Sequence, residues 1–431
     1  MNDNNINSID YMKMSTDPIT ESGINRRADI FMIVLFLCLI FIPAILFWIL
    51  PDKKISEDEN RSLQQAPTFS IDNLVSGKFT SSMGKYYADQ FPFRNTFVGA
   101  KTLFSYVFLI NENKGVVIAK DGYLIQRFDK YSEKSIAEKS SDELGMDLTF
   151  DENMANIKNN CGYINQFYEN IKTLYPDVKL AVAVPPRKID VMTNKLPMFF
   201  PTERNEIYWK QLEKYINQDI YVDLLDILKS RNDEYIYNKT DHHWTTLGAY
   251  YAYAAFIEKM GYEIISKEDY TIETATEGFY GVNWSKAGAK WIEPDIIEYY
   301  RFYDDEGMYF TKIHSNENDK ILNGFYDYEK LETKDKYASF LGGINSHISI
   351  YPSERVSFIK SREKLLLIAD SFGQSLAPFL ANHYDIEIID TRFFNDNIYD
   401  FINEYDITDI LILHNMENLS TQNNLVKLTR K

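Results

Sequence analysis

Residues 364–373 read KLLLIADSFG, an apolar run of five residues followed by Asp370, Ser371, Phe372 and Gly373. A short, continuous apolar run is typical of a strand that is buried on both faces of a parallel sheet. The residues after it, to about 383, have a helical pattern. The stretch therefore predicts a buried strand followed directly by a helix, with Ser371 at the junction.

The same alternation of strand and helix patterns extends in both directions along the chain. Strands that alternate with helices predict an α/β fold, in which a parallel sheet is flanked by helices. The expected strands are 178–186, the start of 221–230, 234–238, 385–392 and 409–415. The expected helices are about 152–174, the end of 221–230, 245–261 and 398–405.

We expect four regions along the chain. Residues 1–29 are a polar tail, 30–50 a membrane anchor, 51–135 a stalk that packs on the main domain, and 136–431 the main domain, with an insertion at about 262–360. The stalk is expected to contain a β-hairpin at 115–126, because its central Asp-Gly pair is a strong signal for a two-residue turn.

Residues 30–50, IFMIVLFLCLIFIPAILFWIL, contain no charged side chain. A helix of this length spans ~31 Å, about the thickness of the hydrocarbon core of a bilayer. A cleaved signal peptide would have a shorter core and small residues at the cleavage point, whereas Pro51 and Asp52 follow here. We therefore expect an uncleaved transmembrane anchor. Two basic residues flank it on each side, so charge alone does not decide its orientation.

The composition excludes several other classes of protein. The chain has 431 residues and a formal net charge of −17, which argues against nucleic acid as a partner because phosphate binding needs a basic face. Its two cysteines are Cys38, which lies inside the apolar run, and Cys161. They predict neither a disulfide framework nor a cysteine-based zinc site.

Residues 241–250 read DHHWTTLGAY and place Asp241 and His243 two residues apart at the start of an expected helix. A carboxylate on one ring nitrogen fixes the tautomer of a histidine, which leaves the other nitrogen free to accept a serine proton. Alternatively, Asp241 caps the helix and both histidines are solvated. A metal site is less favoured, because adjacent histidines point in different directions and no second ligand pair is evident.

Ser371 also has two interpretations. In open parallel sheets, reactive groups collect where strands end and helices begin, and the free N–H groups of the helix can stabilise an oxyanion. Taken alone, Ser371 is better explained as an N-cap. Together with Asp241 and His243 at another strand end, it is better explained as a nucleophile. Ser375, one turn further on, is expected on the helix surface.

At this point the sequence resembles a known family, the DHHW proteins, which are relatives of the alginate O-acetyltransferases within the SGNH-hydrolase-like superfamily. The resemblance covers about residues 55–415. The stretches that carry it are TDHHWTTLGAYYAY (240–253), SEDENRSLQQAP (56–67), YYADQFPFR (86–94), the hairpin at 115–126 and ADSFG (369–373).

The resemblance implies a circularly permuted SGNH-hydrolase-like fold in which the acid–histidine pair precedes the serine. Asp241 and His243 match the Asp-x-His pair, and Ser371 matches the nucleophile. Asn415 falls where a permuted order would place an oxyanion donor, and the backbone N–H of Phe372 is a second candidate. We expect no metal and no cofactor.

Three further residues are candidates for substrate binding. Arg187 follows a strand end after two prolines, Asn345 belongs to the turn FLGGIN, and Arg94 lies in YYADQFPFR. For Asn345 and Arg94, a purely structural role in a turn is the more economical interpretation.

The function implied is a membrane-anchored, extracytoplasmic O-acyltransferase that acetylates a cell-surface or secreted polysaccharide through an acyl-enzyme. The resemblance places the N-terminal tail in the cytoplasm and implies a polytopic membrane-bound acyltransferase as the partner that supplies acyl groups. Two alternatives remain open: a carbohydrate esterase that uses the same three residues with water as acceptor, and a non-enzymatic polysaccharide-binding or assembly protein.

Overall fold

The computed structural model describes residues 26–59, 61–128, 150–302, 307–353 and 362–430. The chain divides into two compact units. The first comprises Met1–Ser56 and Ser62–Arg94, and the second comprises Glu57–Arg61 and Asn95–Lys431. The division falls inside the expected stalk of 51–135, and the domain boundaries given above stay a prediction.

The first unit contains the apolar helix and two short helices. Helix α1 (Arg26–Ile49) includes the segment Ala28–Ile49, which among the described residues is the one helix long and apolar enough to cross a membrane. Its position near the N-terminus fits a single-pass anchor or a signal sequence. Helix α2 (Ile71–Val75) and helix α3 (Lys78–Asp89) follow.

An eight-stranded sheet forms the centre of the second unit, in the order β11-β10-β12-β14-β13-β15-β6-β7. The five strands from β14 to β7 run parallel, whereas β12, β10 and β11 are added in antiparallel pairs. The predicted α/β fold with a parallel sheet is confirmed. The strands are β6 (Lys179–Ala183), β7 (Tyr221–Val222), β10 (Tyr309–Ile313), β11 (Lys320–Asn323), β12 (His347–Pro352), β13 (Glu363–Ala369), β14 (Tyr384–Ile389) and β15 (Asp409–Leu413).

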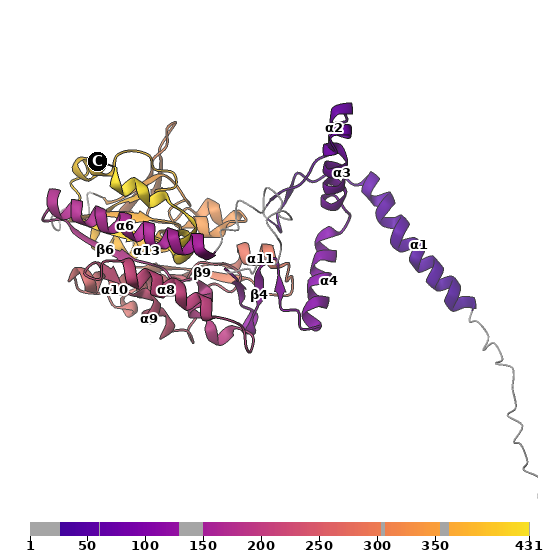
Figure 1. Ribbon diagram of the computed structural model, residues 1–431, viewed down its shortest axis with the longest axis horizontal. Helices are drawn as coiled ribbons and strands as arrows, with labels where there is room; N and C mark the ends of the chain where they lie inside the picture. The colour runs from indigo at the N-terminus through magenta and orange to yellow at the C-terminus, as the bar shows by residue number, and fades with distance from the viewer. Residues whose placement is uncertain (1–25, 60, 129–149, 303–306, 354–361, 431) are drawn as a thin grey trace, which may run out of the picture. The chain divides into compact units, whose positions relative to one another are not determined.

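The centre of the core lies along β13 and β15, where the apolar run of the sequence is found. Leu365, Leu366, Leu367 and Ile368 are completely buried, which requires cover on both faces of the sheet. Helix α6 (Phe150–Leu174) lies on one side of the sheet and helix α10 (Thr246–Met260) on the other (Figure 1). Continuous burial of this kind explains why β13 has no polar positions between Leu365 and Ala369.

Each helix expected in the second unit is present, at Phe150–Leu174, Leu224–Lys229, Thr246–Met260, Gly373–Leu380 and Ile398–Glu404, and further helices that were not expected lie between them. Helix α10 begins after Thr245, whose hydroxyl accepts from the N–H of Gly248, and ends at Gly261 with φ +80°. The bounds are α4 (Arg94–Val107), α6 (Phe150–Leu174), α7 (Lys188–Val191), α8 (Glu203–Tyr215), α9 (Leu224–Lys229), α10 (Thr246–Met260), α11 (Val282–Ala287), α13 (Gly373–Leu380), α14 (Ile398–Glu404) and α15 (Met416–Thr421).

Two smaller sheets complete the second unit. The predicted hairpin at 115–126 is present as β4 (Val116–Ile118) and β5 (Leu124–Gln126), with β3 (Glu112–Asn113) beside β4. Asp121 and Gly122 both have positive φ at its turn, as the Asp-Gly pair predicts. The other sheet pairs β8 (Thr271–Phe279) with β9 (Asp295–Arg301).

The expected strand at 234–238 is wrong. Its only β contact among the described residues is an isolated bridge between Tyr237 and Trp244. The carbonyl of Ile236 accepts from the N–H of Thr245, and the N–H of Asn238 donates to the carbonyl of His243. Because these groups bond to residues 243–245, the segment supports the turn before α10 and does not join the central sheet.

Candidate active site

The turn that carries Asp241 and His243 is held between Asn238 and helix α13. The side-chain amide of Asn238 donates to the carbonyls of His243 (3.2 Å) and Trp244 (3.1 Å). Trp244 is completely buried, and its Nε1 donates to Oγ of Ser375 at 2.9 Å. The turn before α10 is therefore tied to the first turn of α13, although the two are far apart in sequence.

Ser371 lies between the end of β13 and the start of α13, and it is 8% exposed. The N-cap of α13 is Phe372, and no side chain caps that end of the helix. The hydroxyl of Ser371 instead lies 2.7 Å from Nε2 of His243. Its position therefore differs from the one that an N-cap role would require.

Asp241, His243 and Ser371 form one continuous line of hydrogen bonds. Oδ1 of Asp241 lies 2.6 Å from Nδ1 of His243 and also accepts from the backbone N–H of His243 at 3.0 Å. The other carboxylate oxygen accepts from the N–H of Val282 at 3.0 Å. With a proton on Nδ1, Nε2 of His243 has its lone pair directed at the hydroxyl of Ser371.

Two opposing effects set the pKa of Asp241. Burial works to raise it, but the neighbouring charges of His242 and His243 and the hydrogen bonds from His243 outweigh burial. The pKa of this carboxyl is therefore held well below its usual range. An ionised Asp241 can stabilise the imidazolium that forms when His243 takes a proton.

Asp241 occupies the space that a side chain at position 281 would fill, and Gly281 has none. A Cβ built on Gly281 would lie 2.3 Å from both Cβ and Oδ2 of Asp241, a distance that side chains cannot share. The residue is therefore a packing requirement of the site, although nothing in its local sequence indicated this.

We expect Gly281→Ala to displace Asp241 and to cost about 1–3 kcal/mol of folding stability, as overpacking of a buried site does. Activity should fall more than this loss of stability explains. Gly278→Ala is the matched control, because a Cβ there would meet only the hydroxyl of Thr276 at an ordinary 3.7 Å. Thermal unfolding and activity of both variants check this, and equal behaviour of the two would contradict it.

The sequence did not indicate that Trp244, Tyr337 and Ser375 support the site. The ring of Tyr337 stacks on His243 with centroids 4.0 Å apart and planes 9° apart. The hydroxyl of Tyr337 also lies 2.9 Å from that of Ser375. Ser375 is 1% exposed, so its expected place on the helix surface is wrong: it joins Trp244 and Tyr337 beneath the site.

The two expected oxyanion donors bond to Asp370 in this structure. The N–H of Phe372 donates to Oδ1 of Asp370 at 3.0 Å, and the amide of Asn415 donates to Oδ2 at 2.8 Å. The side-chain oxygen of Asn415 accepts from the N–H of Asn418, so Asn415 caps α15. In contrast, the N–H of Ser371 has no hydrogen-bond partner among the described residues.

The three expected substrate residues lie in different surroundings. Arg187 is buried, pairs with Asp190 at 2.8 Å and lies over the ring of Phe128 at 4.7 Å. The amide of Asn345 donates to the carbonyl of Gly343, which closes its turn. Arg94 belongs to the first unit, whereas the residues of the triad belong to the second.

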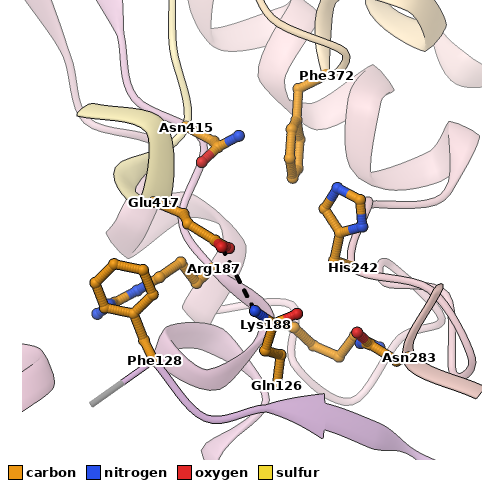
Figure 2. A pocket seen from close by; sticks show the side chains of 9 residues that line it. All are labelled: Gln126, Phe128, Arg187, Lys188, His242, Asn283, Phe372, Asn415 and Glu417. Atoms are coloured by element: carbon orange, nitrogen blue, oxygen red, sulfur yellow. Dashed lines mark hydrogen bonds between the residues drawn. The ribbon is translucent and has the colours of Figure 1, made fainter. Parts of the chain in front are cut away.

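A cavity lies next to the triad (Figure 2). It is lined by His242 and Phe372, the chain neighbours of His243 and Ser371. Phe372 and His242 lie across this cavity from Phe128 and Glu417. The amide of Gln126 donates to the carboxylate of Glu417 at 3.5 Å. His242 also lines the pocket that contains Ser371, so its ring separates the two spaces.

His242 is the acid-sensitive group of the site. Burial is the main cause that lowers the pKa of His242 to about 3, and repulsion from His243 is the second. The side chain of His242 is nevertheless 34% exposed. An unfolded chain binds a proton at this residue below about pH 6.5, whereas the folded chain does so only near pH 3. The unfolded state therefore binds more protons in that window, and the folded state loses stability as the pH falls through it.

We expect His242→Gln to reduce this acid sensitivity. The wild-type protein should lose more thermal stability than the variant between about pH 6.5 and the acid end of the window. Partial exposure of the ring reduces the size of the effect. Melting temperatures measured against pH check this, and parallel profiles for the two proteins would contradict it.

Two groups of side chains bring three metal-ligating atoms within 4.8 Å of one another among the described residues. One group is Asp241, His242 and His243, and the other is His314, His347 and Glu387. In the second group the imidazole rings stack at 3.8 Å with planes 5° apart, so their lone pairs do not converge on one point. The second group therefore lacks the converging lone pairs of a metal site, and in the first group both ring nitrogens of His243 already face Asp241 and Ser371.

Comparison with known proteins agrees with this architecture. Residues 204–389 match the model of the family described as DHHW protein, so the predicted resemblance is confirmed. A DHHW family protein from Eubacterium siraeum is 22% identical over 74% of this chain and 96% of its own, with a TM-score of 0.56. PatB1 from Bacillus cereus, whose structure carries a sulfonyl adduct, is 20% identical over 70% of this chain and 97% of its own, with a TM-score of 0.54.

The O-acetyltransferase domain of Pseudomonas putida AlgJ is also similar, at 13% identity over 73% of this chain and 99% of its own, with a TM-score of 0.40. No curated protein sequence matches this chain. At these identities the structures of the Eubacterium siraeum protein and of PatB1 show a common fold alone, and the chemistry has to be argued from the residues of this chain.

Proposed function

From the DHHW match over residues 204–389, we propose that this protein is an O-acyltransferase that moves an acetyl group to a hydroxyl of a polysaccharide. The observation that carries the proposal is the line of hydrogen bonds from Asp241 through His243 to Ser371, at 2.6 and 2.7 Å. The 2.7 Å between His243 and Ser371 lies within the range in which a base can take the proton of a nucleophile, and the 2.6 Å between Asp241 and His243 allows the carboxylate to orient that base.

In the first half of the proposed reaction, Oγ of Ser371 attacks the acyl carbonyl while its proton passes to Nε2 of His243. Asp241 stabilises the resulting imidazolium through Nδ1–H. When the tetrahedral intermediate collapses, the bond to the leaving group breaks and His243 returns the proton to that group. Ser371 is then acetylated.

In the second half, a sugar hydroxyl gives its proton to His243 and attacks the acetyl carbonyl. The bond between the acetyl group and Oγ breaks, and the proton returns to Ser371. In both halves we propose that the N–H of Ser371 stabilises the oxyanion, because Phe372 and Asn415 already donate to Asp370.

The surroundings of Ser371 favour a sugar acceptor. Tyr280, Gln374 and Lys334 line the same pocket as Ser371 and combine an aromatic ring with hydrogen-bonding groups. Such a mixture suits a sugar, which presents both C–H faces and hydroxyl groups. The polysaccharide itself is proposed from the family resemblance.

We further propose that α1 is an uncleaved anchor and that the domain after it is extracytoplasmic, where a polytopic membrane-bound acyltransferase supplies the acyl group. A predominantly apolar helical segment of 22 residues supports the anchor. The alternative is a signal sequence that is removed.

We expect a protease added outside intact cells to degrade the chain beyond about residue 55 and to leave an N-terminal fragment in the membrane, because residues 28–49 span the bilayer. Immunoblotting with tags at the two ends checks this. Protection of the C-terminal tag would contradict the extracytoplasmic assignment, and loss of the N-terminal tag from mature protein would indicate cleavage.

The deciding experiment offers the purified full-length chain p-nitrophenyl acetate, with and without an oligosaccharide acceptor. Mass spectrometry is expected to find an acetyl group on Ser371 and, with the acceptor present, on the sugar. Release of acetate at the same rate with or without the acceptor would support the esterase. Absence of both product and adduct, with binding of the acceptor retained, would support the non-enzymatic role.

A further inference from the structure

The end of α4 and the residues that follow it present large apolar side chains to solvent. We define the apolar ridge as Leu103, Phe104, Val107, Phe108, Leu109 and Ile110. Their exposed fractions run from 46% for Leu103 to 84% for Leu109. A single exposed leucine is ordinary. Six neighbouring side chains of this size form a patch of the kind that marks an interaction site.

Another face of α4 is already used for packing. Gly99 and Thr102 are buried, and a Cβ on Gly99 would lie 2.9 Å from Cγ of Lys290. The amide of Asn113 donates to the hydroxyl of Thr102 at 3.1 Å and to the carbonyl of Ala287 at 2.8 Å. Helix α4 is therefore fixed to the second unit by one face, and the ridge consists of exposed side chains at its C-terminal end and of the three residues that follow it.

The charge of this segment sets it apart from the rest of the chain. Residues 95–110 contain one basic residue, Lys101, and no acidic residue, in a protein with a net charge of −17. The segment also contains Phe97, Phe104, Tyr106 and Phe108; tyrosine is enriched at the interface between a membrane and water, and phenylalanine is common on the apolar face of helices that lie in it. A surface without acidic groups avoids repulsion from anionic lipid headgroups.

We propose that the apolar ridge inserts into the surface layer of a lipid bilayer, as a second membrane contact besides α1. The inference rests on the proposed anchor, because an anchored chain tethers the second unit to the same bilayer. The ridge then needs little affinity of its own, since its effective concentration at the membrane is high. Apolar side chains in this layer lie about 5–10 Å deep.

The test uses the full-length chain in liposomes and an environment-sensitive fluorophore on single cysteines. The background is Cys38→Ser with Cys161→Ala, and the labelled sites are Phe108→Cys and Leu109→Cys. Phe199→Cys is the matched control, because Phe199 is 94% exposed and apolar but lies outside the ridge. A nitroxide on the lipid acyl chains should quench labels at 108 and 109 about twofold more than the label at 199, because only the first two reach the acyl region.

Each other outcome overturns the proposal. Equal quenching at all three sites would show that the ridge does not enter the bilayer. A blue shift that appears in detergent as well, without lipid quenching, would show that another part of this chain covers the ridge. A shift that depends on the protein-to-lipid ratio would show contact with a second copy. Wild-type thermal unfolding of the labelled variants excludes misfolding.

Extraction with alkaline carbonate distinguishes a failure of the ridge proposal from a failure of the proposed anchor. If the chain leaves the membrane, the proposed anchor fails and the ridge fails with it. If the chain stays and the labels at 108 and 109 are not quenched, the ridge alone fails. If the chain stays and both labels are quenched, both membrane contacts are supported.

Discussion

Ser371→Ala is expected to abolish the acetyl adduct and to lower the rate of acyl transfer by about 10⁴-fold or more, because the variant has no oxygen to carry the acyl group. The structure makes this the largest single effect, since Oγ of Ser371 is the only group of the triad that would form a bond to the substrate. Mass spectrometry of the adduct and steady-state kinetics with p-nitrophenyl acetate check it.

Ser285→Ala is the matched control for this variant. Ser285 lines the same pocket and is 8% exposed, but it is not part of the hydrogen-bonded triad. It should keep the adduct and most of the rate. If Ser371→Ala kept its activity and lost only about 0.5–2 kcal/mol of stability, the serine would be a helix cap and the nucleophilic mechanism would be wrong.

Asp241→Asn is expected to lower kcat by about 10⁴-fold while changing KM little, because an amide no longer holds His243 with its proton on Nδ1. The carboxylate of Asp241 accepts from Nδ1 and the backbone N–H of His243 and from the N–H of Val282. An asparagine side chain has one oxygen to accept from these three N–H donors, and its own NH₂ group would face the donors that the oxygen does not reach. Separate measurement of kcat and KM checks the expectation.

Asp335→Asn is the control for the loss of a carboxylate from this pocket. Asp335 lines the pocket of Ser371, and burial raises its pKa, whereas the pKa of Asp241 is held below its usual range by the two histidines. Its replacement should leave kcat nearly unchanged. A similar loss in both variants would mean that the electrostatics of the whole pocket, and not the histidine tautomer, control the rate.

The parallel strands could be predicted because a strand that is buried on both faces has a short, continuous apolar sequence. The expected strands at 178–186, 385–392 and 409–415 correspond to β6, β14 and β15 within a few residues. The antiparallel extension by β10, β11 and β12 was not predicted, because these strands lie in the expected insertion at 262–360. Their pairing depends on partners distant in sequence, such as Ile348 with Ile388, which a local pattern does not reveal.

The polar residues of the site could be predicted from the sequence, whereas the residues that hold them in place could not. Asp241, His243 and Ser371 stand out because few side chains carry this chemistry, and the structure brings them together. Trp244 and Tyr337 look like ordinary core aromatics in the sequence. Only the tertiary structure shows Trp244 bonded to α13 and Tyr337 stacked on His243. The same applies to Asp370, whose bonds occupy the two donors expected to stabilise the oxyanion.

The order of strands in the central sheet also has a consequence for how this chain is made. Strand β15 lies between β13 and β6, and β6 and β7 join the rest of the sheet only through it. A ribosome makes the chain from its N-terminus, so the inner edge of β6 has no partner until residues 409–413 have emerged. An early stop codon that removed only the last tenth of the protein's length would leave two half-sheets with open apolar edges, which are prone to aggregate.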